Sequence, residues 1–408
     1  MENLDVKIRA YALKNALAHE GKAMQGPVIS SLFNEGLKKS DMGKYGKKIS
    51  EIIMEVNALG LEKQKKEFEK LHNKVSEREV REGLPELPNA EKGVVMRFRP
   101  APSGPMHVGH IISNMVSSLY VKKYGGKFYI VIDDTDPSTT LPEAYENLKK
   151  DCDWIFGNVY KYLNASDRME LYYKYAENLV KKGYAYVCTC PVDKFKKYSE
   201  DKKDCPCRSL KLKEQLARWN RMLGRGEEKK NMFEQGKAVL RFKTSEKHYG
   251  MANPNPAMRD FPLARINLEN HPLQGNKYRV WPLMNLSVAV DDMELKMTHI
   301  VRGKDHMDNA ERQKMIFEVF NKKYPFAFFM GRIKFKDLIL SKRKITAAIK
   351  EGKFESFEDE KLPTVASLRK RGFNPNAFAK FAEQRGLTEV DKVMDSKEFF
   401  KIIENFNK

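Results

Sequence analysis

The chain has 408 residues, which is more than one ordinary hydrophobic core accommodates and predicts about two to four domains. It carries 75 Lys and Arg against 55 Asp and Glu, and this net charge of +20 favours contact with a polyanion, although a Lys-rich proteome has the same effect. No run of about 18 apolar residues exists and residues 1–5 lack signal-peptide character, so the sequence predicts no membrane span and a cytoplasmic location.

The first part of the chain, residues 1–90, has the pattern of a small helical domain. Apolar residues recur at helical intervals, at Ile49, Ile52, Ile53, Val56 and Leu59. Residues 61–75 add Lys and Glu at short helical offsets. Residues 82–88 are rich in turn-forming Gly and Pro, and we expect them to form a linker.

Residues 93–183 predict the first half of a Rossmann-type domain. A short strand at 94–98 is followed by a loop with Pro and Gly, a helix over 108–122 and a second strand over 128–132. This order is a βαβ unit of a parallel sheet. The predicted fold class is therefore α/β, with a parallel-sheet catalytic domain, a helical domain before it and a helical segment at the C-terminal end.

The rest of the chain predicts an insertion and then a return to the sheet. Residues 184–276 are rich in Cys, Lys and loops, which is typical of an insertion. Residues 277–330 are assigned to the second half of the catalytic domain, with a helix over 309–320. Residues 331–408 hold a Lys- and Arg-rich loop followed by helices.

A turn that suits phosphate is expected where the first strand gives way to the helix. Its residues are Pro102, Ser103, Gly104, and then His107-Val108-Gly109-His110. A helix N-terminus offers N–H groups and a partial positive charge to an anion. Gly109 lets a nucleotide approach the backbone, and His107 and His110 can donate hydrogen bonds to phosphate oxygens. The alternative is a pair of surface histidines beside a turn.

A second cationic element follows about 230 residues later, at Leu340-Ser341-Lys342-Arg343-Lys344. Lys342 is a candidate point charge for a pyrophosphate leaving group. Read by itself, such a run of Lys and Arg is more often a solvated face. Its combination with the histidine turn favours a two-sided site for ATP.

Four of the five cysteines form two Cys-x-Cys pairs, Cys188 with Cys190 and Cys205 with Cys207. Four thiolates are enough for a closed tetrahedral zinc site. Such a structural zinc ion would hold the loop-rich insertion together. The alternative is a set of reduced cysteines without metal.

The histidine turn and the Lys-rich loop together resemble the His-Ile-Gly-His and Lys-Met-Ser-Lys-Ser signatures of class I aminoacyl-tRNA synthetases. The loop variant and its continuation are similar to the glutamyl/glutaminyl branch in its archaeal and eukaryotic style, and the helical N-terminal part is similar to that of archaeal glutamyl-tRNA synthetases. The stretches that carry this narrower resemblance are residues 11–16, 132–137, 255–260, 301–306, 361–364 and 368–373.

The resemblance implies roles for single residues. Arg97 would face the side chain of the amino-acid substrate, Asp133 its α-ammonium group and Arg302 its carboxylate. Met284 stands where a tyrosine often lines this pocket, and it lacks the hydroxyl donor. The ATP-binding assignments are Pro102, Ser103, Gly104, Gly109, Asp305, His306, Leu340 and Ser341, and the catalytic ones are His107, His110 and Lys342. Without the resemblance, the residue types alone favour structural ion pairs for Arg97, Asp133 and Arg302.

The expected reaction uses ATP and Mg²⁺ to convert glutamate to glutamyl-adenylate and then transfers the glutamyl group to the 3′ end of tRNA-Glu. Three alternatives stay open: a glutaminyl-tRNA synthetase, a nucleotidyltransferase with a similar turn, and a catalytically silent RNA-binding subunit. Use of tRNA-Gln as a second acceptor is also open.

Relatives of this branch continue beyond a segment like residues 402–407 into a barrel that reads the anticodon. We therefore expect either a truncated chain or the catalytic half of a split enzyme, with a separate anticodon-binding polypeptide as partner. A natural form that relies on the acceptor stem is the third alternative.

Overall fold

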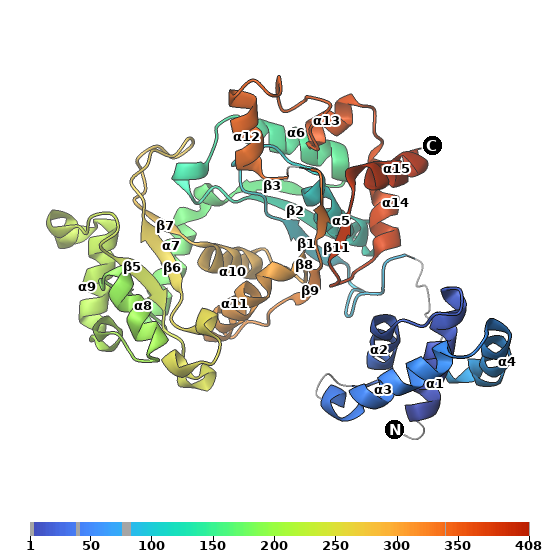
Figure 1. The fold of residues 1–408 in the computed structure, drawn as a ribbon. Helices are drawn as coiled ribbons and strands as arrows, with labels where there is room; N and C mark the ends of the chain where they lie inside the picture. Colours follow the sequence, from blue (N-terminus) through green and yellow to red (C-terminus); the bar gives the residue numbers. More distant parts are fainter. Residues whose placement is uncertain (1–3, 38–40, 76–82, 339, 408) are drawn as a thin grey trace. The chain divides into compact units, whose positions relative to one another are not determined.

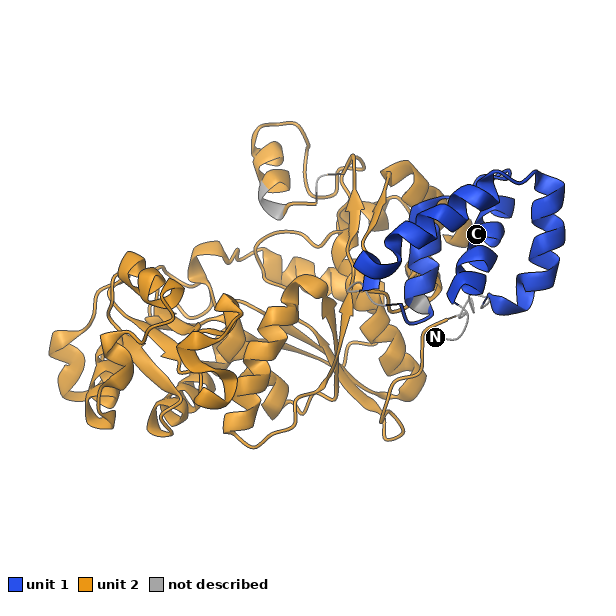
Figure 2. Ribbon diagram, turned by 60° about the horizontal axis from the view of Figure 1, so that its bottom comes forward, with its two compact units in different colours: residues 1–81 blue, residues 82–408 orange. Residues whose placement is uncertain are grey.

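The computed structural model describes residues 4–37, 41–75, 83–338 and 340–407, apart from the side chains of Asn34, Lys342 and Arg343. The chain divides into two compact units, residues 1–81 and residues 82–408 (Figure 2). The boundary falls at the start of the Gly- and Pro-rich stretch expected to be a linker. Leu87 and Ala90, which the sequence analysis placed in the helical domain, pack in the core of the second unit.

The first unit is helical. Its helices are α1 (Leu4–Ala18), α2 (Gln25–Asn34), α3 (Met42–Asn57) and α4 (Leu61–Leu71). The apolar residues that recur at helical spacing on α3 are buried against α1, where Ile8 and Leu13 have no exposed surface. Gln64 is buried as well, and its amide donates to the carbonyls of Gly21 and Val56.

The second unit is built around a parallel sheet (Figure 1). β1 pairs with β2, and β2 with β3, all in parallel. The backbone N–H of Thr298 donates to the carbonyl of Val95, so β8 lies beside β1, and β9 pairs with β8 in parallel. The strand order is therefore β3-β2-β1-β8-β9, as in a Rossmann sheet. The strands are β1 (Val94–Phe98), β2 (Gly126–Ile132), β3 (Lys161–Asn164), β8 (His299–Gly303) and β9 (Phe326–Met330).

Helices connect the strands and carry the apolar side chains that cover the sheet. Tyr120 on α5 and Phe156 on α6 are fully buried in the main core. These helices are α5 (Val108–Tyr124), α6 (Ala144–Phe156), α7 (Met169–Lys181), α10 (Met284–Glu294) and α11 (Met307–Val319). The expected strands and helix of the first βαβ unit are confirmed. β3 adds a third parallel strand between α6 and α7.

The insertion contains an antiparallel sheet of its own, in the order β4-β5-β6-β7. β7 includes Val280 and Trp281, which the sequence analysis assigned to the second half of the catalytic domain, but it pairs antiparallel with β6. The catalytic sheet therefore resumes only at β8. The elements of the insertion are β4 (Ala185–Cys188), α8 (Val192–Glu200), α9 (Leu212–Leu223), β5 (Val239–Phe242), β6 (Pro262–Ile266) and β7 (Val280–Pro282).

The C-terminal segment combines helices with a small parallel sheet of β10 and β11. Phe378 on α14 and Phe399 on α15 are buried in the same core as the Rossmann strands, so this segment packs on α5 and α6. The elements are β10 (Ile333–Phe335), α12 (Lys342–Lys350), α13 (Val365–Lys370), α14 (Pro375–Arg385), β11 (Lys392–Met394) and α15 (Ser396–Asn407).

Candidate active site

The histidine turn forms the N-terminus of α5, where the sequence analysis expected a phosphate site. His107 is the N-cap, and its Nδ1 accepts a hydrogen bond from the backbone N–H of Gly109 at 3.2 Å. His110 completes the cap, because its Nδ1 accepts from the backbone N–H of His107 at 3.1 Å. Since Nδ1 is the acceptor in both rings, the proton of each neutral imidazole is on Nε2. Both histidines therefore present an N–H donor on the side of the ring away from the cap.

The turn is held by a distant part of the chain. The backbone N–H of Val108 donates to the carbonyl of Pro363 at 2.9 Å, and the N–H of Val365 donates to the carbonyl of Met106 at 2.9 Å. Thr364, which caps α13, bridges to His107 and is fully buried. These bonds, together with the capping bonds within the turn, fix the position of the two histidines.

A cavity of about 420 Å³, here called the nucleotide pocket, opens at this turn. His107, Gly109 and His110 line one part of it, and Asp305 and His306, which follow β8, line another. A Cβ at Gly109 would lie 3.0 Å from Cε1 of His107, so a side chain there would crowd the histidine ring. Its further lining residues include Ile112, Met330, Gly331, Arg332, Ile333, Leu340 and Arg385.

The charges on Asp305 and His306 are set by their neighbours. Arg332 contacts both carboxylate oxygens of Asp305, at 2.6 and 3.2 Å. Burial raises the pKa of Asp305, but the hydrogen bond from Arg332 and the charge of His306 outweigh it and leave the pKa below its ordinary value. Burial and the charge of Arg302 lower the pKa of His306, so this imidazole is neutral near pH 7.

A second cavity of about 410 Å³, here called the amino-acid pocket, adjoins the first. The two share His110, Ser113, Gly303 and His306 as lining residues, so a ligand in one pocket can touch a ligand in the other. The four residues assigned to the amino acid from the sequence all line the second pocket: Arg97, Asp133, Met284 and Arg302.

Most of the charges in the amino-acid pocket are paired within the protein. Arg97 is buried and forms a bidentate pair with Asp292 of α10, at 2.6 and 2.8 Å. Arg99 contacts Asp133 at 3.0 Å and also bonds to Asp291. Arg97 and Asp133 therefore form ion pairs within the protein. This is the role that their residue types favour when the family resemblance is set aside.

Arg302 differs from these arginines. It donates to Oε1 of Gln313 at 3.0 Å and lies 4.0 Å from the sulfur of Met284. In the described part of the chain, no carboxylate lies within ion-pair distance of its guanidinium. Burial and the charge of Arg97 lower the pKa of Arg302, although an arginine remains charged near pH 7. A partly buried cation that no carboxylate pairs with favours binding of an anion.

Some of the other residues assigned to ATP lie away from the nucleotide pocket. Ser103 lines the amino-acid pocket, whereas Pro102 and Gly104 line neither pocket. Ser341 is the N-cap of α12, with its hydroxyl accepting from the N–H of Lys344 at 3.5 Å. Lys342 begins α12, but its side chain lies outside the described residues.

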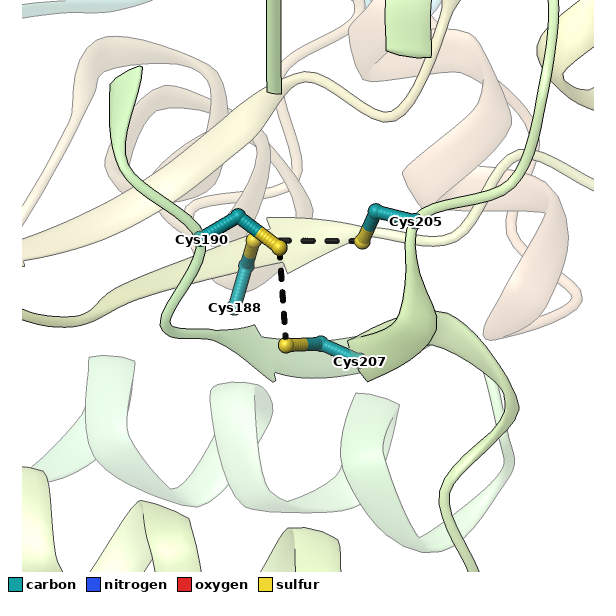
Figure 3. Close-up of side chains that lie close together, drawn as sticks. All are labelled: Cys188, Cys190, Cys205 and Cys207. Atoms are coloured by element: carbon teal, nitrogen blue, oxygen red, sulfur yellow. Dashed lines mark hydrogen bonds between the residues drawn. The ribbon is translucent and has the colours of Figure 1, made fainter. Parts of the chain in front are cut away.

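The cysteines of the insertion form a cluster (Figure 3). Their four sulfur atoms lie within 4.8 Å of one another, with Cys188 3.9 Å from Cys205 and Cys190 3.8 Å from Cys207. A tetrahedral zinc ion with Zn–S bonds of about 2.3 Å requires S–S separations near this size. Arg218 lies 3.4 Å from the Cys207 sulfur and would offset part of the thiolate charge. The cluster therefore fits a zinc ion.

The geometry agrees with comparisons to known proteins. Residues 93–406 match the family described as tRNA synthetases class I (E and Q), catalytic domain. The chain belongs to this family. A glutamate–tRNA ligase of Pyrococcus furiosus is 42% identical over 395 residues, covering 93% of this chain and 67% of the relative. A glutamate–tRNA ligase of Thermococcus kodakarensis is 41% identical over 404 residues, covering 96% and 68%.

This class I synthetase chain spans about two thirds of the length of these relatives. A solved glutamate–tRNA ligase from Elizabethkingia meningosepticum superposes with a TM-score of 0.52 at 17% identity, covering 77% of this chain and 68% of that one, and supports the fold assignment. Among the helices of the described residues, none combines the length and the apolar character needed to cross a membrane.

Three groups of functional interest were missed in the sequence of this synthetase. Asp291 and Asp292 neutralise the arginines of the amino-acid pocket, and Pro363 holds the histidine turn. Arg385 lines the nucleotide pocket from outside the Rossmann sheet. The two adjacent aspartates at the end of the apolar run Val288-Ala289-Val290 were a signal in the sequence, because buried carboxylates require partners. Pro363 lies in one of the stretches that carry the family resemblance, but nothing local predicts its contact with the histidine turn, and nothing local marks Arg385.

Proposed function

We propose that this chain catalyses glutamate–tRNA ligation. In the first step, ATP and glutamate give glutamyl-adenylate and pyrophosphate, and in the second the glutamyl group passes to the 3′ end of tRNA-Glu. The observation that carries the proposal is the junction of the two pockets. One begins at a helix N-terminus suited to phosphate, and the other contains the unneutralised guanidinium of Arg302. Family membership supports the same reaction class.

In the activation step a glutamate carboxylate oxygen attacks the α-phosphorus of ATP, the bond to the bridging oxygen breaks and pyrophosphate leaves. His107 and His110 donate from Nε2 to phosphate oxygens as negative charge develops. Lys342 neutralises the leaving pyrophosphate, and Mg²⁺ accompanies the triphosphate. The protein then acts by positioning and electrostatics and requires no nucleophile of its own.

The amino acid is held in the pocket of Arg302. Glutamate has a net negative charge near pH 7 and glutamine has none, so the positive charge of Arg302 attracts glutamate more strongly, although both amino acids can pair with it through the α-carboxylate. Arg97 and Asp292 form a pair that is neutral overall, and this pair orients the substrate by hydrogen bonds rather than by net charge. The pocket thus supports glutamate over glutamine, and relatives named as glutamate–tRNA ligases support the same choice.

The insertion is proposed to bind the acceptor stem of the tRNA, with Cys188, Cys190, Cys205 and Cys207 holding a structural zinc ion. The chain's charge of +20 supports binding of a polyanion. A reaction that consumes ATP and charges tRNA is expected in the cytoplasm. The proposal extends to a separate anticodon-binding polypeptide as partner, and copurification with the native protein tests this.

Two measurements test the proposal. The purified chain is given labelled glutamate or glutamine, with ATP, Mg²⁺ and either tRNA-Glu or tRNA-Gln, with and without proteins that copurify with it. Charging of tRNA-Glu with glutamate is expected, and charging with glutamine alone would contradict the proposal. Metal content is measured separately, and about one zinc per chain is expected, with loss of the metal in Cys205→Ser.

A further inference from the structure

Arg385 is the last residue of α14, and it lines the nucleotide pocket although α14 lies outside the Rossmann sheet. Its Nη2 donates to the carbonyl oxygen of Gly331 at 2.6 Å. Gly331 directly follows β9 and is itself part of the pocket lining. A single hydrogen bond to a backbone carbonyl uses one of the five N–H donors of a guanidinium.

The position of Arg385 is fixed by backbone contacts. The N–H of Gly331 donates to the carbonyl of Thr388 at 2.8 Å. A Cβ at Gly331 would lie 2.2 Å from the carbonyl oxygen of Val390, so only glycine allows the two segments to approach this closely. The N–H of Arg332 also donates to the carboxylate of Asp391 at 2.8 Å. The segment that follows α14 is therefore built into the wall of the pocket.

The charge of Arg385 has no counterpart in the pocket. Asp305 is the one carboxylate among the described lining residues, and it is already paired with Arg332. In the described part of the chain no carboxylate lies within ion-pair distance of Arg385. The charge of Asp391, which does not line the pocket, acts on Arg385, but no carboxylate pairs with its guanidinium at the cavity.

The surroundings indicate which part of a nucleotide Arg385 meets. The phosphate-binding turn lies at the N-terminus of α5, whereas Arg385 is anchored on the segment after β9. The same pocket has apolar side chains that suit the faces of a purine ring, those of Ile112, Met330, Ile333 and Leu340. A planar guanidinium packs well on an aromatic ring and donates to ring nitrogens.

We propose that Arg385 binds the purine base of ATP and so makes the C-terminal segment part of the nucleotide site. This inference rests on the proposed use of ATP at the same pocket. Loss of the guanidinium should weaken binding of every ligand that contains the base, whether or not it has phosphates. Glutamate binding, which takes place in the adjoining pocket, should not change.

The test compares Arg385→Ala, Arg385→Lys and the wild-type chain by calorimetric titration with ATP and with adenosine. The matched control is Arg371→Ala, which removes another arginine of the C-terminal segment. Arg371 lies over the ring of Phe373 at 4.8 Å and does not line the pocket. The thermal midpoint is recorded for each variant, and KM values for ATP and glutamate are measured by pyrophosphate exchange with tRNA present.

We expect Arg385→Ala to raise the Kd for ATP and the Kd for adenosine by the same factor, about tenfold, while the KM for glutamate stays unchanged. Arg385→Lys should recover little of this loss, because an ammonium group lacks the planar face. Arg371→Ala should bind both ligands as the wild type does.

Weaker binding of ATP with unchanged binding of adenosine would show that Arg385 contacts a phosphate group and would overturn the inference. Wild-type affinity for ATP in Arg385→Lys would do the same. Equal losses for ATP and glutamate, or unchanged ATP binding, would also overturn it. If the wild-type chain bound ATP but activated no amino acid, the proposed function would fail while the calorimetric comparison still decided the role of Arg385.

Discussion

The amino-acid pocket and the nucleotide pocket share His110 and His306, but they treat charge in different ways. In the amino-acid pocket Arg97 and Arg99 are paired with buried aspartates, and Arg302 alone among the described lining arginines lacks a carboxylate. In the nucleotide pocket the donors are histidines whose orientation is set by backbone hydrogen bonds. The amino-acid pocket contains one arginine, Arg302, that no carboxylate pairs with, whereas the nucleotide pocket combines oriented histidine N–H groups with the guanidinium of Arg385.

The largest expected effect comes from removing a donor at the nucleotide end. His110→Ala should lower the rate of adenylate formation by about 10²- to 10³-fold, because a preorganised donor to the transition state is lost. Lys342→Ala should cause a similar loss. The measurement is pyrophosphate exchange with tRNA present. The affinity for tRNA, measured separately, should be nearly unchanged.

The control for this comparison is His72→Ala in the helical N-terminal unit, where the exposed His72 ring lies with its Nδ1 2.7 Å from the carbonyl oxygen of Glu69. It should retain the wild-type exchange rate. An unchanged rate in His110→Ala would show that the oriented histidines are structural, and the contrast between the pockets would then be lost.

A smaller effect is expected at the amino-acid end. Arg302→Gln keeps hydrogen-bonding capacity but removes the charge, so the KM for glutamate should rise about 100-fold while the KM for ATP changes little. Initial rates measured against each substrate in turn provide the test. A parallel rise in both KM values would show that Arg302 supports the fold of the whole site rather than selecting the amino acid.

The paired charges should behave differently from Arg302 because they stabilise the protein. Asp292→Asn leaves Arg97 buried with a weakened partner, and we expect a loss of about 3 kcal/mol in the free energy of unfolding. Replacement of both residues, as Arg97→Met with Asp292→Leu, should recover much of this stability. Urea denaturation of the wild type and the two variants measures the stability. An Asp292→Asn variant as stable as the wild type would contradict the assignment of Arg97 to a structural pair.

The smallest effect concerns an ion pair outside both pockets, between Asp151 of α6 and Arg369 of α13, at 3.3 Å. Burial raises the pKa of Asp151 to about 7, and the charge of Arg369 offsets this only in part. The folded protein therefore binds a proton at Asp151 more tightly than the unfolded chain does, so stability falls as pH rises from about 4 to about 7.

Asp151→Asn removes that dependence. The variant should melt at a higher temperature than the wild type at pH 8, and the difference should shrink as the pH is lowered to 5. Thermal melts at the two pH values test this. A variant that is less stable than the wild type at pH 8 would show that the contact with Arg369 is enough to keep the buried Asp151 ionised, and would contradict this prediction.

Patterns within short stretches of sequence were enough to predict much of the fold and part of the candidate site. The strand, turn and helix around His107 follow from local apolar spacing and turn residues, and the cysteine cluster follows from two Cys-x-Cys pairs. β7 was harder to place, because a short apolar strand carries no information about which sheet it joins.

Contacts between distant residues could not be predicted in this way. Arg97 and Asp292 are separated by 195 positions, and their pairing depends on the crossing of β1 and α10. The bond between Val108 and Pro363 and the arrival of Arg385 at the nucleotide pocket depend equally on how the C-terminal segment packs. These contacts decide which arginines hold the fold together and which face a ligand.

The most direct test of the central claim is aminoacylation by the purified chain with each of the two amino acids. Labelled glutamate and labelled glutamine are supplied separately, with ATP, Mg²⁺ and tRNA-Glu, and the label on tRNA is measured for the wild type and for Arg302→Gln. The account predicts that the wild type charges tRNA with glutamate and that Arg302→Gln loses this activity at low glutamate. Charging with glutamine in preference to glutamate, or full glutamate charging by Arg302→Gln, would contradict it.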